Sequence, residues 1–165
     1  MEAPDLVAVT RVAVAAGLTV ALVEQPYRVA GRRTSPPAPR LDEGWIAAIA
    51  HLRARELDDL PLVTGGRSAG ARVACRTARE TEAVAVLCLA FPVHPPGKPE
   101  KSRMDELDAA GVPVLVVQGE SDPFGMPGDG PDRTVVRVRG NHGLKTDLEA
   151  VAAAAGEWLP GAIGR

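Results

Sequence analysis

Ser68 has the clearest chemical context in the chain, at the centre of Gly66-Arg67-Ser68-Ala69-Gly70. This G-x-S-x-G pattern follows an apolar run typical of a strand and precedes a stretch that favours a helix. A nucleophile elbow needs that order, because glycines leave room for a tight turn that lifts the serine hydroxyl clear of the sheet. The Ala69 N–H, at the helix start, is the predicted donor to an oxyanion. We therefore expect Ser68 to act as a nucleophile.

A serine hydroxyl is a poor nucleophile until a base takes its proton, so Ser68 requires a histidine and an acid further along the chain. Asp122 follows one predicted strand, and His142 follows the next. The carboxyl ends of parallel strands meet at one edge of a sheet, where α/β proteins place their sites. The order Ser68, Asp122, His142 is the order of the triad that accompanies this elbow.

Other residues compete for these roles. Among the three histidines, His51 falls in a predicted helix and His94 in a proline-rich loop, which leaves His142 as the base. Glu120 is the rival acid, but it lies closer to the strand end than Asp122. Arg67 and Arg72 flank the elbow and are candidates for binding an acidic group of a substrate, the alternative being that they are solvated or paired.

The elements that must position these residues alternate along the whole chain, which is the pattern of an α/β sheet with crossover helices. Strands are expected at 18–23, 60–64, 83–90, 112–118 and 134–139. Helices are expected at 5–16, 41–57, 69–79 and 101–110, with a last one ending near 158; Asp5 is the expected cap of the first. Residues 25–40 are expected to form an irregular loop. We predict one domain, residues 1–165, with a mostly parallel sheet of about five strands between two layers of helices.

Composition narrows the classes of function. The net charge is −2 and aromatic residues make up 3% of the chain, which argues against nucleic-acid binding by phosphate neutralisation or base stacking. The longest apolar stretch, 12–23, is too short to span a bilayer. The acidic first residues lack the basic start of a signal peptide, so we expect a cytoplasmic protein. Cys75 and Cys88 are expected to be free, buried thiols, and no metal site or cofactor is predicted.

Four segments together resemble one family. The elbow, 65–74, resembles that of the α/β-hydrolase-like family that includes testis-expressed protein 30 and subunit 3 of the NSL complex. The proline-rich stretch Phe91-Pro92-Val93-His94-Pro95-Pro96-Gly97-Lys98 is similar to that family's most distinctive segment. Residues 118–125 resemble its acid loop, and 141–145 its histidine loop. The resemblance implies an α/β-hydrolase fold related to dienelactone hydrolases, with no settled substrate. Because the family also contains a scaffolding subunit, the fold alone does not guarantee catalysis.

The chain departs from this family at its start. Family members typically begin with a strand and a loop that supplies a second oxyanion N–H, and only then have the helix matched here by 5–16. The resemblance implies that this strand lies in mid-sheet, between the strands matched by 18–23 and 60–64. Either the start codon is assigned too far downstream, which we favour, or this is a shortened form with weak or no activity.

These observations predict a serine hydrolase that acts on an ester or similar acyl bond of a small molecule. In this interpretation Ser68 attacks, His142 transfers the proton and Asp122 orients His142. The main alternative is an interaction module that keeps the fold by descent; it has no physical need for all three residues. A third hypothesis is a flavodoxin-like protein that binds phosphate with the 65–70 turn. This hypothesis leaves Asp122 and His142 unexplained. The substrate and the oligomeric state are not predicted.

Overall fold

A parallel sheet of four strands forms the centre of the computed structural model, which describes residues 3–55 and 59–164. The strands lie in the order β1-β2-β3-β4 and comprise β1 Val63–Arg67, β2 Ala85–Leu89, β3 Val114–Gly119 and β4 Arg133–Val138. Each strand is parallel to its neighbour, so every connection must cross back over a face of the sheet. The carboxyl ends of all four strands therefore meet at one edge.

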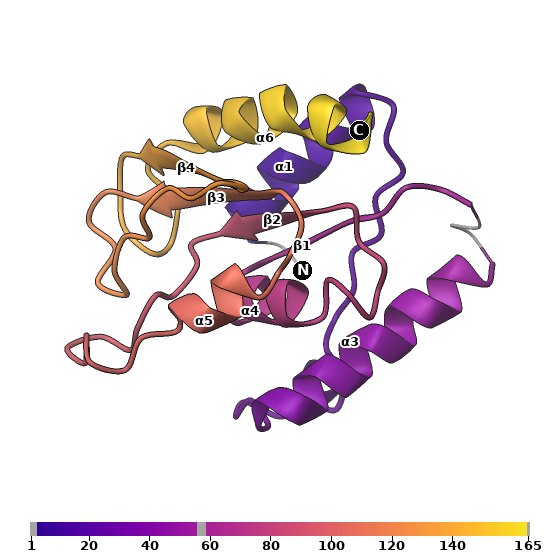
Figure 1. Ribbon diagram of the computed structural model, residues 1–165, viewed down its shortest axis with the longest axis horizontal. Coiled ribbons are helices and arrows are strands. Elements are labelled where there is room, and N and C mark those ends of the chain that lie inside the picture. Colours follow the sequence, from indigo (N-terminus) through magenta and orange to yellow (C-terminus); the bar gives the residue numbers. More distant parts are fainter. Residues whose placement is uncertain (1–2, 56–58, 165) are drawn as a thin grey trace.

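Helices cover both faces of the sheet, as Figure 1 shows. They are α1 Pro4–Ala15, α2 Pro26–Val29, α3 Ala38–Arg53, α4 Ala69–Arg76, α5 Met104–Asp108 and α6 Leu148–Ile163. Helices α1 and α6 pack together on one face, and α4 and α5 pack on the other with α3 beyond α4. This is the predicted α/β-hydrolase arrangement, with four strands where about five were expected.

Strand β2 shows how one apolar run serves both faces. Alternate side chains of a strand point in opposite directions. Val86 and Cys88 belong to the cluster with α4 and α5, whereas Leu87 and Leu89 belong to the cluster with α1 and α6. All five residues of β2 are buried, as expected of a central parallel strand.

The prediction of a strand at 18–23 is wrong. These residues have no regular secondary structure, and Leu22 is 42% exposed. Their apolar character matches that of a buried strand, but a strand also needs a neighbour with which to exchange backbone hydrogen bonds. The segment instead lines a groove of about 480 Å³, and β1 lines the same groove.

This groove between 18–23 and β1 is apolar. Its lining includes Leu18, Val20 and Leu22 from the irregular segment, Val63 and Thr64 from β1, and Trp45 and Ile49 from α3. None of its described lining residues carries a charge. Within the described residues β1 pairs only with β2, so its other edge faces the groove. These are the two segments between which the resemblance predicts a further strand.

Several element boundaries differ from the predicted ones. Ala3, rather than Asp5, occupies the N-cap position of α1 and makes no side-chain capping bond, and Asp5 lies inside the first turn with 1% exposure. The short helix α2 lies within the predicted loop at 25–40. The predicted end of the helix at 41–57 falls partly at 56–58, outside the described residues. Helix α6 continues through Pro160 to Ile163, because Leu159 and Ala162 are buried and hold its last turn in place.

Cys75 and Cys88 are free and buried, as predicted. Their sulfur atoms lie 3.4 Å apart, between α4 and β2. The hydrogen bond with Cys75, together with burial, raises the pKa of the Cys88 thiol well above its usual value. The described helices include none with the length and apolarity needed to cross a bilayer.

Candidate active site

Ser68 lies in a strained turn between β1 and α4. Its backbone has φ 54° and ψ −112°, in the region that favours glycine. The turn is possible because position 66 has no side chain: a Cβ on Gly66 would lie 2.5 Å from the backbone carbon of Gly70. The Ser68 N–H donates to the carbonyl of Leu89, which fixes the turn to β2. The hydroxyl is thereby held at the carboxyl edge of the sheet, as a nucleophile elbow requires.

The three predicted triad residues are in contact. The Ser68 Oγ lies 2.8 Å from His142 Nε2, and His142 Nδ1 lies 2.8 Å from Asp122 Oδ2. The serine and the histidine are 74 positions apart in the chain, so only the fold brings them together. The Asp122 side chain is 0% exposed, and that of His142 is 17% exposed. Such a chain of contacts can move a proton from a hydroxyl to an imidazole and hold the imidazolium beside a carboxylate.

The Asp122 carboxylate is held by two other residues. Its Oδ1 accepts a hydrogen bond from the Phe124 N–H at 2.8 Å, and its Oδ2 accepts one from Gln118 Nε2 at 2.9 Å. The Gln118 amide also lies 3.0 Å from the Phe91 carbonyl oxygen and 2.8 Å from that of Gly125. Gln118 is fully buried at the end of β3. These contacts leave the carboxylate oriented toward the imidazole.

The loop that carries His142 is a tight turn packed against the end of β3. A Cβ on Gly119 would lie 2.5 Å from the carbonyl oxygen of Asn141, so only glycine allows this approach. Gly140 has φ 118°, and Leu144, with φ 46°, donates its N–H to the Asn141 carbonyl. The Phe124 ring stacks on the imidazole of His142 with 4.1 Å between ring centroids. The ring of His142 is therefore constrained on its face as well as at both nitrogens.

Two further predicted residues belong to the elbow helix. Ala69 is the first residue of α4, so no earlier turn of that helix supplies a carbonyl for its N–H. That N–H is placed beside Ser68, where an oxyanion donor is expected. Arg72 lies one turn further on, and both of its bonded nitrogens donate to the carboxylate of Glu106.

Arg67, also predicted to bind a substrate, makes two contacts within the chain. Its Nε lies 2.8 Å from Asp5 Oδ2, and its Nη2 donates to the carbonyl of His142 at 2.9 Å. Arg67 and Arg72 are therefore paired, as in the alternative interpretation of their sequence context.

The rival residues lie elsewhere. Glu120 is exposed just after β3, whereas Asp122 faces the histidine. His94 bonds through Nδ1 to the carbonyl of the adjacent Pro95, and His51 lies exposed in α3. Sequence reasoning missed Asp5 as the partner of Arg67, and Gln118 and Phe124 as neighbours of the triad. Gln118 lies four residues before Asp122 and Phe124 two residues after it, and this closeness in sequence was the available signal.

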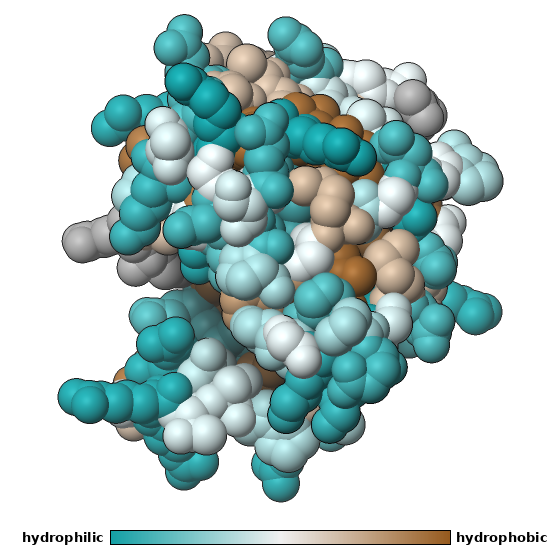
Figure 2. Space-filling model, turned by 90° about the vertical axis from the view of Figure 1, so that its left-hand side faces the viewer, coloured by the Kyte–Doolittle hydropathy of each residue, from teal (hydrophilic) through white to brown (hydrophobic). Residues whose placement is uncertain are grey.

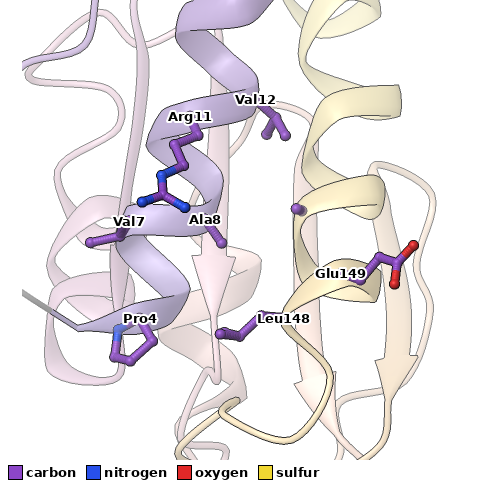
Figure 3. A pocket seen from close by; sticks show the side chains of 8 residues that line it. Pro4, Val7, Ala8, Arg11, Val12, Leu148 and Glu149 are labelled. Carbon is purple, nitrogen blue, oxygen red and sulfur yellow. The ribbon is translucent and has the colours of Figure 1, made fainter.

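The surface around this edge is mostly hydrophilic, with smaller apolar areas near its middle (Figure 2). A separate surface cleft of about 520 Å³ lies between α1 and α6, and Figure 3 shows the side chains that line it, including Arg11 and Glu149. Ser68, Asp122 and His142 are not among its lining residues. In the part of the chain that the structure describes, no three or more His, Cys, Asp or Glu side chains gather as metal ligands.

The chain belongs to the alpha/beta hydrolase family. The family's model, described as an alpha/beta hydrolase domain, matches residues 1–137. No curated protein matches the chain. The broader part of the resemblance is thereby confirmed, and membership of the narrower family of testis-expressed protein 30 stays a prediction.

Three solved structures with similar folds come from Xanthomonas campestris and Coxiella burnetii. A proposed hydrolase of the alpha/beta superfamily from Xanthomonas campestris pv. campestris is 20% identical with a TM-score of 0.68, over 97% of this chain and 91% of that one. An alpha/beta serine hydrolase without a lid, from Xanthomonas campestris, is 19% identical with a TM-score of 0.73, over 100% and 76% of the two chains. An alpha-beta serine hydrolase homologue from Coxiella burnetii is 15% identical with a TM-score of 0.67, over 96% and 77%. At these identities the likeness defines the fold.

Proposed function

We propose that the protein is a serine hydrolase that cleaves an ester or a similar acyl bond of a small molecule. The observation that carries the proposal is the unbroken contact from Ser68 Oγ through His142 to Asp122, with both distances at 2.8 Å. These three side chains come from three separate loops at one edge of the sheet. Membership of the alpha/beta hydrolase family and the serine hydrolases among the structural neighbours support it.

In the proposed reaction, the Ser68 oxygen attacks the carbonyl carbon while its proton moves to His142 Nε2. The imidazolium that forms is stabilised by the Asp122 carboxylate at Nδ1. The tetrahedral intermediate then collapses, the bond to the leaving group breaks, and His142 gives its proton to the leaving oxygen. Water repeats the sequence on the acyl-enzyme and regenerates the free hydroxyl.

The negative oxygen of the intermediate needs donors that are already in place. We assign this role to the Ala69 N–H, because it is the first amide of α4 and follows Ser68 directly. The resemblance predicts a second N–H from a loop that precedes the helix matched by 5–16. Each such donor is typically worth about 10²–10³-fold in rate, so the Ala69 N–H is a substantial part of the proposed mechanism.

The finer predictions remain part of this proposal. They are the relationship to dienelactone hydrolases and to the family of testis-expressed protein 30 and NSL-complex subunit 3, the cytoplasmic location, and a single domain over residues 1–165. They also include a small acyl compound as the partner, without nucleic acid, membrane, metal or cofactor. An interaction module has no comparable observation in its favour.

A fluorophosphonate probe tests the proposal directly, because it reacts with activated serines. We expect labelling of the wild-type protein and none of Ser68→Ala. Ser35→Ala is the matched control, because Ser35 is exposed in the loop before α3 and lies outside the triad. Equal labelling of Ser68→Ala and wild type, or a folded wild-type protein that stays unlabelled, would contradict the proposal.

A further inference from the structure

Arg67 joins three parts of the protein that are distant in sequence. It is the last residue of β1 and directly precedes Ser68. Its Nη2 donates to the His142 carbonyl at 2.9 Å, and its Nε lies 2.8 Å from Asp5 Oδ2 in the first turn of α1. Its backbone is thus fixed beside the nucleophile while its side chain contacts the residue that would act as the base.

The contact with His142 adds a restraint that the backbone turn of the histidine loop does not itself provide. The loop is anchored at Gly140, whose carbonyl accepts from Ser121, and at Asn141, whose carbonyl accepts from Leu144. Within the described residues, Arg67 is the only hydrogen-bond donor to the carbonyl of His142. The guanidinium therefore restrains the backbone at the position of the imidazole, independently of the bonds that the ring makes.

The ion pair with Asp5 keeps the guanidinium in place. Asp5 is 1% exposed, and within the described residues neither of its carboxylate oxygens accepts a hydrogen bond. The 2.8 Å contact with Arg67 lacks hydrogen-bond alignment, so the attraction between the two is that of opposite charges. A buried carboxylate needs such a compensating charge. Asp5 consequently holds the arginine close to α1, between the helix and the histidine loop.

From these contacts we infer that Arg67 is a positioning residue, which sets the distance between His142 and Ser68 by joining the β1 end to the histidine loop. The inference rests on the proposed hydrolase function and replaces the expected role of Arg67 in substrate binding. Displacement of a catalytic group by about 1 Å can lower the rate by about 100-fold, so a restraint at this carbonyl matters for the reaction.

Arg67→Lys tests this inference without removing the charge that Asp5 needs. A lysine carries one compact ammonium, which cannot at the same time lie beside the carboxylate and donate to the carbonyl, as a guanidinium does. With p-nitrophenyl acetate, a neutral ester, we expect kcat to fall by about 10–100-fold with KM unchanged and the thermal unfolding midpoint near that of wild type. The rate of fluorophosphonate labelling should fall in parallel. Arg79→Gln, at an exposed arginine beyond α4, is the control and should match wild type.

The double variant Asp5→Asn with Arg67→Met removes both charges together and guards against misfolding caused by an unpaired carboxylate. It should also lose kcat with the neutral ester. Wild-type kcat in Arg67→Lys would overturn the inference, as would a rise in KM confined to an ester that carries a carboxylate, since that pattern defines a substrate-binding arginine. If the folded wild-type protein neither cleaves the ester nor reacts with the probe, the proposed function fails and this inference fails with it.

Discussion

At its carboxyl end β1 turns so tightly that a Cβ on Gly66 would lie 2.5 Å from Gly70, whereas its outer edge borders an apolar groove of about 480 Å³. The two regions belong to the same short strand. The carboxyl end is fixed by β2, by α4 and by the histidine loop. The outer edge has backbone groups without a neighbouring strand in the described residues. The contacts of the proposed triad therefore depend on the side of β1 that is fully paired.

The difference shows which parts of the sheet the proposed site needs. Ser68, Asp122 and His142 follow β1, β3 and β4, and these strands are joined through β2 in one continuous set of pairings. The groove borders the edge of β1 that has no partner strand in the described residues, and Leu87 and Leu89 of β2 also line it. Substitutions at the turn should therefore change activity, and those that only line the groove should change stability.

Gly66→Ala is expected to have the largest effect. The added Cβ meets backbone atoms of Gly70, which cannot move without opening the turn. We expect the free energy of unfolding to fall by about 2–3 kcal/mol and fluorophosphonate labelling to be lost. Gly70→Ala, in the same motif, is the control because a Cβ there would have no heavy atom within 4 Å. It should retain labelling and gain up to about 1 kcal/mol, since alanine favours a helix. Equal losses in the two variants would show that the turn does not depend on position 66.

Thr64→Val tests the outer edge. Thr64 is 2% exposed and lines the groove, and its hydroxyl oxygen has no hydrogen-bond partner within the described residues. Replacement of an unpaired buried hydroxyl by a methyl group should raise the free energy of unfolding by about 1 kcal/mol, as measured in urea.

Thr77→Val is the matched control, because the buried Thr77 hydroxyl donates to the Val73 carbonyl at 2.8 Å. It should lower the free energy of unfolding by about 1 kcal/mol. Both variants should keep their fluorophosphonate labelling. A loss of stability in Thr64→Val as large as that in Thr77→Val would mean that the Thr64 hydroxyl is satisfied, and the contrast between the two regions would weaken.

The smallest effect is expected from substitution of Glu106. This residue lies in α5, on the face of the sheet that α4 and α5 cover, and does not line the groove. Burial raises the pKa of its carboxyl, but the hydrogen bonds and charges of Arg72 and Arg76 outweigh burial, and the pKa is lowered overall. A carboxyl with a lowered pKa stabilises the folded state above its unfolded pKa, about 4.3 for glutamate. This contribution is lost as the pH falls through the lower, folded pKa.

Urea unfolding of wild type and Glu106→Gln at a series of pH values measures that contribution. Wild type should be the more stable protein near neutral pH, and the difference should shrink as the pH drops below about 4. A difference that stays constant across this range would show that the ionisation of Glu106 is not linked to folding.

Patterns that are local in sequence predicted most of the described fold. The apolar run 112–118 predicted β3, because a central parallel strand is buried on both faces and its sequence is continuously hydrophobic. The glycines that follow predicted the loop after it. The elbow, the acid and the histidine were predicted from their places after strands. Their mutual contacts follow from one rule, that parallel strands end at the same edge of the sheet.

These local patterns could not predict contacts between residues that are distant in sequence. Residues 18–23 have the composition of a strand, but a strand forms only where a neighbour accepts its hydrogen bonds. Asp5 has a residue type and a position that are typical of a helix cap. It pairs instead with Arg67, whose position relative to α1 is set by the folded sheet. Gln118 is marked in the sequence only by its closeness to Asp122, and its role depends on three acceptors that the fold brings around its amide.

The amide of Gln118 reaches the carbonyl of Phe91, the carboxylate of Asp122 and the carbonyl of Gly125. One side chain thereby ties the proline-rich loop after β2 to the loop after β3. An insertion or deletion in either loop would have to preserve the meeting point of all three acceptors. The two loops are therefore structurally coupled. A change in either loop that suits a new substrate would also change the position of the Asp122 carboxylate.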